Sequence, residues 1–392
     1  MRSYHAQQQT PQLPLPGALE LNHSSRLIEL IVAEIEQNGV MPFSQYMHIA
    51  LYQPGLGYYS AGAAKFGSSG DFITAPEISP LFGRCLARQC ESIFLQGCAR
   101  HLLEFGAGSG KLCEQILSSL PDLLSYSIVE ISADLKTRQQ AYLQQNLPQT
   151  LFNRIKWLDK LPHSFDGVIV GNEVLDAMPV NVVLKHGQWR ELGVGYEDER
   201  LIWQYYVEQS DAVSAIEAIE RSFIEADIGA LPQDYCTEVN LNFKPWLKAL
   251  QDCCHQAVIL MIDYGYEQWQ YYHPQRTSGT LICHYRHRAH TDPFFYPGLQ
   301  DITAFVDFDA FADAALSAGF SVCGLASQCR FLLHNGLLDE ARLIEQNGIK
   351  AQIELAQQIK TLTLPGEMGE KFKVIGMQKN LAIDIPALAG EG

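Results

Sequence analysis

The chain has 392 residues, 47% of them hydrophobic and 18% charged, so it can bury a sizeable core as one elaborated domain or as two modules. Its formal net charge of −16 argues against nucleic acid as the main partner, because phosphate backbones are bound by clusters of Lys and Arg. No apolar run approaches the ~18 residues that a membrane-spanning helix needs. The ten cysteines form no C-x-x-C pair, and this pattern favours reduced thiols and a cytoplasmic location.

The N-terminal part of the chain is expected to be helical after a disordered, Gln- and Pro-rich tail over residues 1–19. The stretch 62–79 is rich in glycine, and a loop of that length ahead of a core strand is typical of a lid or a binding loop. Apolar spacing and helix-stop signals predict three helices, over residues 24–37, 43–51 and 80–96.

The central part alternates between short apolar runs and amphipathic segments. The pattern predicts strands and helices in a regular order: strands 102–105, 127–131, 154–158 and 165–171, and helices 111–120 and 133–145. This rhythm predicts an α/β fold with a doubly wound, mostly parallel sheet. After Pro179 apolar and polar residues alternate, which indicates three antiparallel strands with turns near Gly187 and residues 197–200. Later elements complete the expected fold: helices 211–225, 241–254 and 308–318, and strands 257–264, 279–285, 320–327 and 372–379.

The segment HLLEFGAGSGKL at residues 101–112 has an apolar run that reaches Glu104, followed by alternate glycines: Gly106, Gly108 and Gly110. A P-loop needs Ser or Thr where Leu112 stands, and the dinucleotide fingerprint G-x-G-x-x-G needs glycine where Lys111 stands, so both are excluded. The remaining pattern, E-x-G-x-G-x-G, is that of S-adenosylmethionine (SAM) methyltransferases. We expect the methionine carboxylate at the helix N-terminus and the ammonium end at Glu104.

The next two strands end in residues suited to the nucleoside half of SAM. The second strand delivers Glu130, whose carboxylate can accept two hydrogen bonds from a ribose diol, and Ile131 follows it. Asp159 follows the third strand beside Trp157 and is a candidate for the adenine pocket, with a surface loop as the alternative. SAM is therefore the expected cofactor.

The fourth strand ends in GNEVLDAMPV at residues 171–180, where Asn172, Glu173 and Asp176 follow a buried run. Ligands of open α/β sheets bind beyond the carboxyl ends of the strands at the switch point, so these groups are expected to face the transferred methyl group. Carboxylates can pair with a cationic nitrogen and orient it for in-line attack, which makes the three residues catalytic candidates. Asn172 is also expected to contact the cofactor. The alternative is a helix N-cap at Asp176.

Two other groups of polar residues are weaker candidates. Asp263 and Tyr264, at the end of a late strand, are candidates for the acceptor cleft, or they mark an exit from strand to turn. His284, His287 and His290 are spaced by three residues, but metal ligands at that spacing would need a helix where a strand is expected. No metal is therefore predicted.

Six segments, in this order, resemble the MidA family of class I SAM-dependent methyltransferases: GDFITAPEIS at 70–79, LLEFGAGSGKL at 102–112, YSIVEIS at 126–132, GNEVLDAMPV at 171–180, MIDYGY at 261–266 and DITAFVDF at 301–308. The resemblance implies a Rossmann-like SAM-binding core with an N-terminal helical cap and a β-rich insertion. It also implies that the loop over 70–79 closes over the cofactor, with Gly70, Asp71 and Thr74 at the cofactor and Glu77 at the substrate.

That family includes a mitochondrial assembly factor that methylates an arginine of a complex I subunit. The resemblance therefore implies methylation of an arginine in a protein client with a basic segment, such as a respiratory-complex subunit. Two alternatives remain open: a small-molecule methyltransferase with the same SAM site, and a SAM-binding assembly chaperone without catalysis. The expected organisation is a tail (1–19), an N-terminal helical cap with the cofactor-covering loop (20–97), a SAM-binding core (98–180), a β/α insertion on the acceptor side (181–256), the completion of the core sheet (257–380) and a tail (381–392).

Overall fold

The computed structural model describes residues 13–61, 73–206, 209–344 and 348–389. The chain forms two compact units, each of which draws on three segments. The first unit takes its described residues from Met1–Phe72, Met178–Leu241 and Pro274–Ala304, and the second from Ile73–Ala177, Asn242–His273 and Phe305–Gly392. Every described candidate site residue lies in the second unit, whereas the candidates Gly70 and Asp71 lie outside the described residues.

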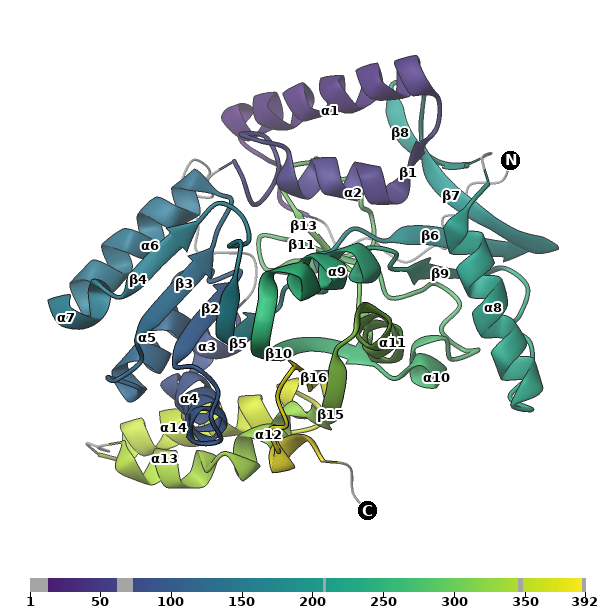
Figure 1. Ribbon diagram of the computed structural model, residues 1–392. Coiled ribbons are helices and arrows are strands. Elements are labelled where there is room, and N and C mark those ends of the chain that lie inside the picture. Colours follow the sequence, from purple (N-terminus) through teal and green to yellow (C-terminus); the bar gives the residue numbers. More distant parts are fainter. Residues whose placement is uncertain (1–12, 62–72, 207–208, 345–347, 390–392) are drawn as a thin grey trace. The chain divides into compact units, whose positions relative to one another are not determined.

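In its described residues, the first unit contains a five-stranded antiparallel sheet in which β1, β7, β6 and β9 are neighbours and β8 pairs with β7. A second antiparallel sheet has the order β12-β11-β13. The helices α1 and α2, purple in Figure 1, pack against β7. The elements are α1 (Ala18–Asn38), β1 (Met41–Pro42), α2 (Phe43–Tyr52), β6 (Asn181–His186), β7 (Gln188–Glu197), β8 (Arg200–Tyr205), α8 (Asp211–Glu225), β9 (Tyr235–Val239), β11 (Ile282–Tyr285), β12 (Arg288–His290) and β13 (Asp301–Thr303).

The alternating pattern after Pro179 is confirmed, because β6, β7 and β8 form an antiparallel meander. Its turns lie at Gly187 and at Asp198-Glu199, and all three residues have positive φ. The sequence pattern missed β9. This strand is buried along its whole length yet carries Thr237 and Glu238, so neither alternation nor an apolar run marks it.

Helix α1 begins at Ala18, inside the segment that was expected to be a disordered tail. The Glu20 carboxylate accepts the backbone N–H of Gly17 at 2.5 Å, which caps the helix at this point. Further along, Leu27 is fully buried and anchors the helix in the core of the first unit. The tail prediction is therefore wrong at its C-terminal end, while residues 1–12 lie outside the described part of the chain.

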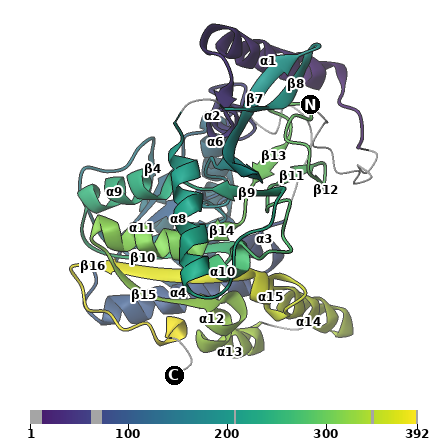
Figure 2. The ribbon, with the colours of Figure 1, turned by 90° about the vertical axis from the view of Figure 1, so that its right-hand side faces the viewer.

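The second unit is built on a sheet of eight described strands with the order β15-β16-β10-β5-β2-β3-β4, and with β14 paired to β10. Neighbours from β10 to β4 are parallel, whereas β16, the yellow strand of Figure 2, is antiparallel to both β10 and β15. The predicted doubly wound, mostly parallel sheet is confirmed. Since β3 and β4 follow β2 on one side and β5 lies on the other, the switch point falls between β2 and β5.

The strands of the second unit alternate with helices through most of the sheet. Its elements are α3 (Ala75–Ile78), α4 (Pro80–Leu95), β2 (His101–Phe105), α5 (Lys111–Ser119), β3 (Ser125–Val129), α6 (Ala133–Asn146), α7 (Gln149–Phe152), β4 (Ile155–Leu158), β5 (Phe165–Asn172), α9 (Phe243–Cys253), β10 (Cys254–Tyr266), α10 (Gln268–Tyr271), β14 (Val306–Asp307), α11 (Phe308–Ala318), β15 (Ser321–Ser327), α12 (Gln328–His334), α13 (Leu337–Leu343), α14 (Ile349–Thr363), α15 (Met368–Lys371), β16 (Phe372–Lys379) and a 3-10 turn (Pro386–Leu388).

Helices cover both faces of this sheet, as the alternation of side chains along β2 demonstrates. Leu102 belongs to the core that contains α4 and α5, whereas the ring of Phe105 lies 5.3 Å from that of Trp246 on α9. Residues an odd number apart on a strand point to opposite faces, so α4 and α5 cover one face and α9 the other. Helix α11 packs on α9, with Phe311 edge-on to Phe243.

The C-terminal segment 381–392, which was expected to be a tail, is part of the core as far as residue 388. Three apolar side chains of this segment are buried against the core of the second unit: Ile383, Ile385 and Leu388. The side-chain amide of Gln378 on β16 donates to the carbonyl oxygen of Ile383 and accepts the N–H of the same residue. The tail prediction is wrong here because these apolar side chains gain burial.

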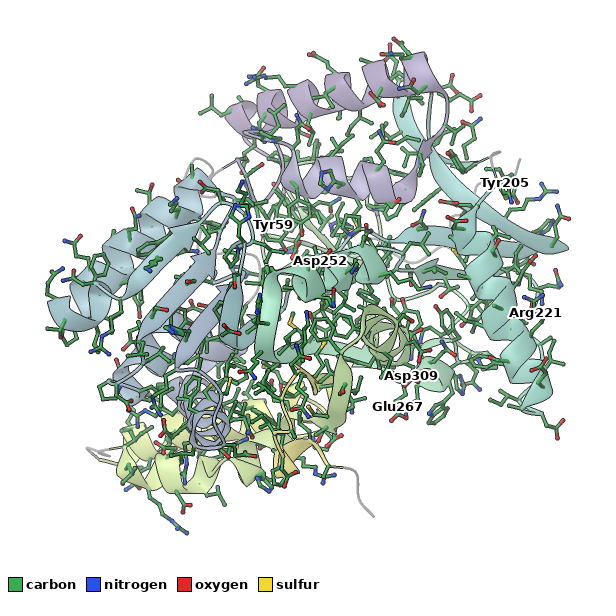
Figure 3. The ribbon with its side chains drawn as sticks, in the orientation of Figure 1. Tyr59, Tyr205, Arg221, Asp252, Glu267 and Asp309 are labelled. Carbon is green, nitrogen blue, oxygen red and sulfur yellow. The ribbon has the colours of Figure 1, made fainter. Side chains whose placement is uncertain are left out.

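Helix α11 also contacts α10. Figure 3 labels Asp309 on α11, and its carboxylate accepts the N–H of Gln268 at the start of α10 at 2.7 Å.

None of the helices within the described ranges is long and apolar enough to cross a membrane. In the same part of the chain, no three His, Cys, Asp or Glu side chains are grouped in a way that could hold a metal ion. His284 lies on β11 and His290 on β12, and the hairpin turn between these strands places Arg286 and His287 at positive φ.

Candidate active site

The glycine-rich loop joins β2 to α5 with a left-handed backbone. Gly106, Gly108 and Gly110 have φ of 64°, 51° and 90°, a region that side chains other than glycine rarely adopt. A Cβ at Gly108 would meet no atom within 4 Å, so the loop leaves open space at this residue. The N-cap residue of α5, Gly110, has no side chain to cap the helix, and the N–H of Lys111 donates to Ser109 Oγ at 3.4 Å. The N–H groups of the residues that follow Lys111 in the first turn are therefore the ones suited to an anionic group.

Glu77 lies on the short helix α3 and contacts this loop. Its carboxylate accepts a hydrogen bond from Ser109 and forms an ion pair with Lys111. Gln115 of α5 adds a bond from its side-chain amide to the carbonyl of Pro76, at 2.9 Å. We expected Glu77 at the substrate, whereas its contacts in the structure attach α3 to the glycine-rich loop. Thr74 precedes α3 as its N-cap residue.

Glu104 is a buried carboxylate on the face of β2 that points toward α4 and α5. It is 1% exposed, and one of its oxygens accepts the phenolic O–H of Tyr126 on β3 at 2.8 Å. Burial raises the pKa of Glu104 to about 8, although the bond from Tyr126 opposes the rise. The protein itself thus supplies a partner for this carboxylate, and its contact with an ammonium group stays a prediction.

Glu130 follows β3 and is held by two hydrogen bonds. One carboxylate oxygen accepts the N–H of Ser132 at 2.8 Å and the other accepts the side-chain amide of Gln139 at 3.0 Å. Burial raises the pKa of Glu130, while hydrogen bonds from Ser132, from Gln139 and from the backbone of Ile131 oppose the rise. Beside it Ile131 is 62% exposed, so an apolar side chain faces outward next to the carboxylate.

Asp159, the candidate for the adenine pocket, is largely exposed and pairs with Lys136 at 3.1 Å. Its neighbour Trp157 points inward and donates its indole N–H to Gln139 at 3.0 Å. Sequence reasoning missed Gln139. The spacing of residues in α6 could have identified it, because Gln139 lies four residues before Leu143 and therefore on the same, buried side of an otherwise polar helix.

The segment after β5 has an unusual backbone at Glu173. Its φ is 55°, which costs a residue with a side chain roughly 1–3 kcal/mol and is found most often at functional sites. Its N–H donates to the carbonyl of Ile262 on β10 at 2.9 Å, and its carboxylate accepts the side-chain amide of Asn172 at 3.1 Å. Asn172 Oδ1 is buried and accepts no hydrogen bond from any described residue.

Asp263 shapes this segment from the neighbouring strand β10. One of its oxygens accepts the backbone N–H groups of Val174, Leu175 and Asp176, at 3.0, 2.8 and 3.3 Å. The other accepts the N–H of Tyr264 at 2.9 Å. We expected Asp263 to line the acceptor cleft, but the residue is 0% exposed and both oxygens bind backbone groups, so its observed contacts are structural.

The side chain of Tyr264 connects β10 to the turn that follows β5. Its phenolic O–H donates to Asp176 Oδ2 at 2.5 Å. No helix begins near Asp176, because the chain passes through a turn to β6, so the alternative of a helix N-cap is excluded. The structure therefore brings together the three catalytic candidates with both residues from the end of β10.

The carboxylates of this cluster stand close together in a buried setting. Burial raises the pKa of Asp176 to about 6, and burial together with Asp176 and Glu173 holds the pKa of Asp263 well above its usual value. Among the described residues, no salt bridge joins Asp176 or Asp263 to a basic side chain. A cationic group placed here would relieve the repulsion between like charges.

These features fit SAM. The open space at Gly108 admits a ligand, the start of α5 suits a carboxylate, and the buried Asn172 Oδ1 is an acceptor in need of a donor. Residues 85–326 match the protein family described as “Putative S-adenosyl-L-methionine-dependent methyltransferase”. The chain belongs to this family. Its cofactor is SAM and its reaction is methyl transfer, which confirms the expected cofactor and the MidA-like resemblance.

Similar proteins extend this result over nearly the whole chain. The Protein arginine methyltransferase NDUFAF7 homolog, mitochondrial, of Drosophila melanogaster is 29% identical, and the alignment covers 91% of this chain and 86% of that protein. Protein arginine methyltransferase NDUFAF7, mitochondrial, of Danio rerio is 26% identical, with 88% and 85% covered. A crystallised superfamily member from Burkholderia thailandensis, bound to S-adenosyl-homocysteine (SAH), is 40% identical with a TM-score of 0.87, and 96% of this chain and 97% of that one are covered.

The prediction of a cytoplasmic location is wrong by this comparison, because the relatives from fruit fly and zebrafish are named as mitochondrial proteins. The prediction depended on cysteines without C-x-x-C pairs. Unpaired cysteines indicate a reducing environment, and that property does not identify a compartment.

Proposed function

We propose that this methyltransferase methylates an arginine side chain of a protein client. The observation that carries the proposal is the pair of carboxylates Glu173 and Asp176 in the turn after β5, which the buried Asp263 of β10 holds in place. The guanidinium group of arginine stays protonated at neutral pH and is planar, so carboxylates can hold it with paired hydrogen bonds. The curated relatives from fruit fly and zebrafish are named protein arginine methyltransferases, which supports the same acceptor.

The proposed roles follow from the contacts of each group. Glu173 holds the guanidinium group and offsets its charge beside the cationic sulfonium, with Asp176 as a second carboxylate. Asn172 uses its unsatisfied Oδ1 to accept an N–H from the cofactor or the arginine. SAM, when bound, supplies a methyl group activated by its positive sulfur and leaves as SAH. The arginine nitrogen that gains the methyl group loses one proton, which an ionised carboxylate of the site can accept. The protein then contributes chiefly by positioning the nucleophile in line with that methyl group and by excluding water.

The proposed cofactor contacts lie along the ends of β2, β3 and β4. The glycine-rich loop from Gly106 to Gly110 lies at the methionine part, with Glu104 toward the ammonium group and Thr74 nearby. Glu130 accepts the ribose hydroxyls, while Ile131 and Asp159 border the adenine. The support for this arrangement is the open backbone at Gly108 and the oriented carboxylate of Glu130.

Transfer of radiolabelled methyl groups from SAM to proteins of a lysate tests the acceptor. We expect Glu173→Gln to keep SAH affinity and to abolish transfer, since the substitution preserves the shape and removes the charge. Glu225→Gln, an exposed position at the end of α8, is the matched control and should transfer normally. Acid hydrolysis of the labelled protein should yield methylarginine.

Other outcomes of this experiment would contradict the proposal. Label in a lipid, a nucleic acid or a small metabolite would exclude the arginine acceptor and favour the small-molecule alternative. Binding of SAH without transfer to any acceptor would favour an assembly chaperone. Wild-type transfer by Glu173→Gln would remove Glu173 from the acceptor site.

A further inference from the structure

Gln139, in the middle of α6, is a fully buried amide with three hydrogen bonds. Its Nε2 donates to the carbonyl oxygen of Gly108 at 3.1 Å and to Glu130 Oε2 at 3.0 Å. Its Oε1 accepts the indole N–H of Trp157 at 3.0 Å. The three partners come from the glycine-rich loop, the end of β3 and the strand β4, so one side chain connects the ends of three neighbouring elements.

The chemistry of these partners requires an amide at position 139. A carboxamide has two N–H donors and one carbonyl acceptor, and here two acceptors face the nitrogen and one donor faces the oxygen. A flipped amide would direct its oxygen at two other oxygens, so the network determines the orientation. A carboxylate at this position lacks the donors, and an aliphatic side chain would remove the partner of the Gly108 carbonyl, the half-buried Trp157 indole N–H and the buried Glu130 carboxylate.

We propose that Gln139 is a positioning residue for the nucleoside half of SAM, which it prepares by holding Gly108, Glu130 and Trp157 in one arrangement. This inference rests on the proposed placement of the ribose at Glu130. Hydrogen bonds from Ser132 and from Gln139 reach different oxygens of the Glu130 carboxylate and orient it for the ribose diol. Preorganisation of this kind lowers the ordering cost of binding.

The same amide couples the two halves of the cofactor site. The carbonyl of Gly108 lies in the loop proposed for the methionine part, and Glu130 lies at the ribose. Because Gln139 holds both through a single nitrogen, a displacement of the amide moves the loop and the ribose acceptor together. Loss of Gln139 should therefore weaken every ligand that contains the nucleoside, and should do so without changing the affinity for the protein client.

Calorimetric titration with SAH tests the proposal on the full chain. Gln139→Met keeps the length of the side chain and removes its hydrogen bonds, so SAH affinity should fall about tenfold or more. In steady-state assays the KM for SAM should rise while the KM for the client stays the same. Gln144→Met, at an exposed position on the same helix, is the control and should bind SAH like the wild type.

The pH dependence of SAH affinity in Gln139→Glu distinguishes a positioning role of this residue from a merely structural one. The new carboxyl group would face Glu130, with Arg138 on α6 and Glu104 on β2 as the other charged groups around that site. At acidic pH the two carboxyls can share a proton and keep a hydrogen bond, whereas at alkaline pH both ionise and repel. SAH affinity of this variant should therefore fall with rising pH more steeply than that of the wild type.

The outcomes separate this inference from the placement on which it rests. Weak SAH binding by Glu130→Ala together with wild-type binding by Gln139→Met would overturn the role of Gln139 alone. Wild-type binding by Glu130→Ala would overturn the ribose placement and the inference with it. A loss of SAH affinity in Gln139→Met accompanied by an equal rise in the KM for the client would indicate general disruption and would also overturn the proposal.

Discussion

The carboxylate of Asp263 accepts the backbone N–H of Leu175 at 2.8 Å, between residues that are 88 positions apart in the chain. The same oxygen accepts the N–H groups of the two residues on either side of Leu175. A single side chain on β10 thus holds the turn that follows β5, directly after Glu173. This contact explains how the left-handed backbone of Glu173 is maintained, because the turn has no regular secondary structure of its own.

Replacement of Asp263 by Ala should disrupt this turn. Three buried backbone donors would lose their acceptor, and each unsatisfied donor costs ~1–3 kcal/mol, offset in part by removal of a buried carboxylate. We expect the free energy of unfolding, measured by urea titration, to fall by about 2 kcal/mol or more, and methyl transfer to be lost. Asp263→Asn, which keeps one acceptor oxygen, should retain more stability. Equal stability of Asp263→Ala and the wild type would contradict the role of this contact.

The rate of methyl transfer should rise with pH through about 6. Burial raises the pKa of Asp176 to about 6, so its carboxylate becomes charged only above that value and can then offset the charge of the acceptor. The bond from Tyr264 stabilises the ionised form, and Tyr264→Phe should therefore shift the rise to higher pH. The profile of kcat/KM against pH measures this shift. Superimposable profiles for Tyr264→Phe and the wild type would argue against Asp176 as the titrating group.

Glu104 should make the stability of the protein depend on pH. Burial raises its folded-state pKa from 4.5 to about 8, so between these values the folded protein binds more protons at this residue than the unfolded chain. This contribution makes the free energy of unfolding fall as pH rises from 4.5 to about 8. Glu104→Gln should remove that slope and be more stable than the wild type above pH 8, on the order of a few kcal/mol.

Denaturant titration across this pH range measures the effect of Glu104→Gln. A variant with the same pH slope as the wild type would mean that the carboxylate ionises without cost. SAH titration of the same variant tests the predicted contact with the ammonium end of the cofactor. Unchanged SAH affinity would contradict that contact and leave Glu104 with its bond to Tyr126.

The open space at Gly108 predicts a specific effect of a larger side chain. Gly108→Val should abolish measurable SAH binding, because the valine would occupy the space that the loop leaves for the ligand. Gly97→Val is the matched control, since Gly97 also has positive φ and open space around it but lies in the turn after α4. Both variants carry similar backbone strain, so only loss of binding is diagnostic. Comparable SAH affinities in the two variants would exclude Gly108 from the ligand site.

The ribose placement at Glu130 predicts a smaller and measurable loss. Glu130→Ala removes a charge-assisted acceptor, which is worth roughly 1.5–3 kcal/mol, so SAH affinity should fall about ten- to a hundred-fold. Adenosine, which keeps the ribose and lacks the amino acid, should show a similar relative loss. Calorimetry with both ligands checks the prediction. An effect on SAH without an effect on adenosine would place Glu130 at the methionine part.

Much of the second unit follows from local sequence patterns. The apolar runs from residue 102 to residue 171 become β2, β3, β4 and β5 with small shifts at their ends, and the alternate glycines after Glu104 adopt the left-handed backbone that their spacing indicates. Helices such as α11 (Phe308–Ala318) agree with the prediction to the residue. These features are predictable because periodicity, helix caps and glycine act within a few residues.

The contacts that join distant segments of the chain at the site could not be predicted from local sequence patterns. No local pattern joins Asp263 to Leu175 or Gln139 to Trp157, because each bond depends on how strands and helices far apart in the chain are packed. The same is true of Glu77, whose bond to the glycine-rich loop depends on the packing of α3 beside α5.

By itself, the sequence determined the α/β class, the family and the segments that carry polar groups, since these depend on residue type and spacing along the chain. The tertiary structure decided what each polar group does. In the structure Asp263 binds the backbone of a turn, Glu104 binds Tyr126, and Gln139 binds Glu130. A buried polar atom must find a partner, and which partner is in reach depends on the three-dimensional packing of the strands.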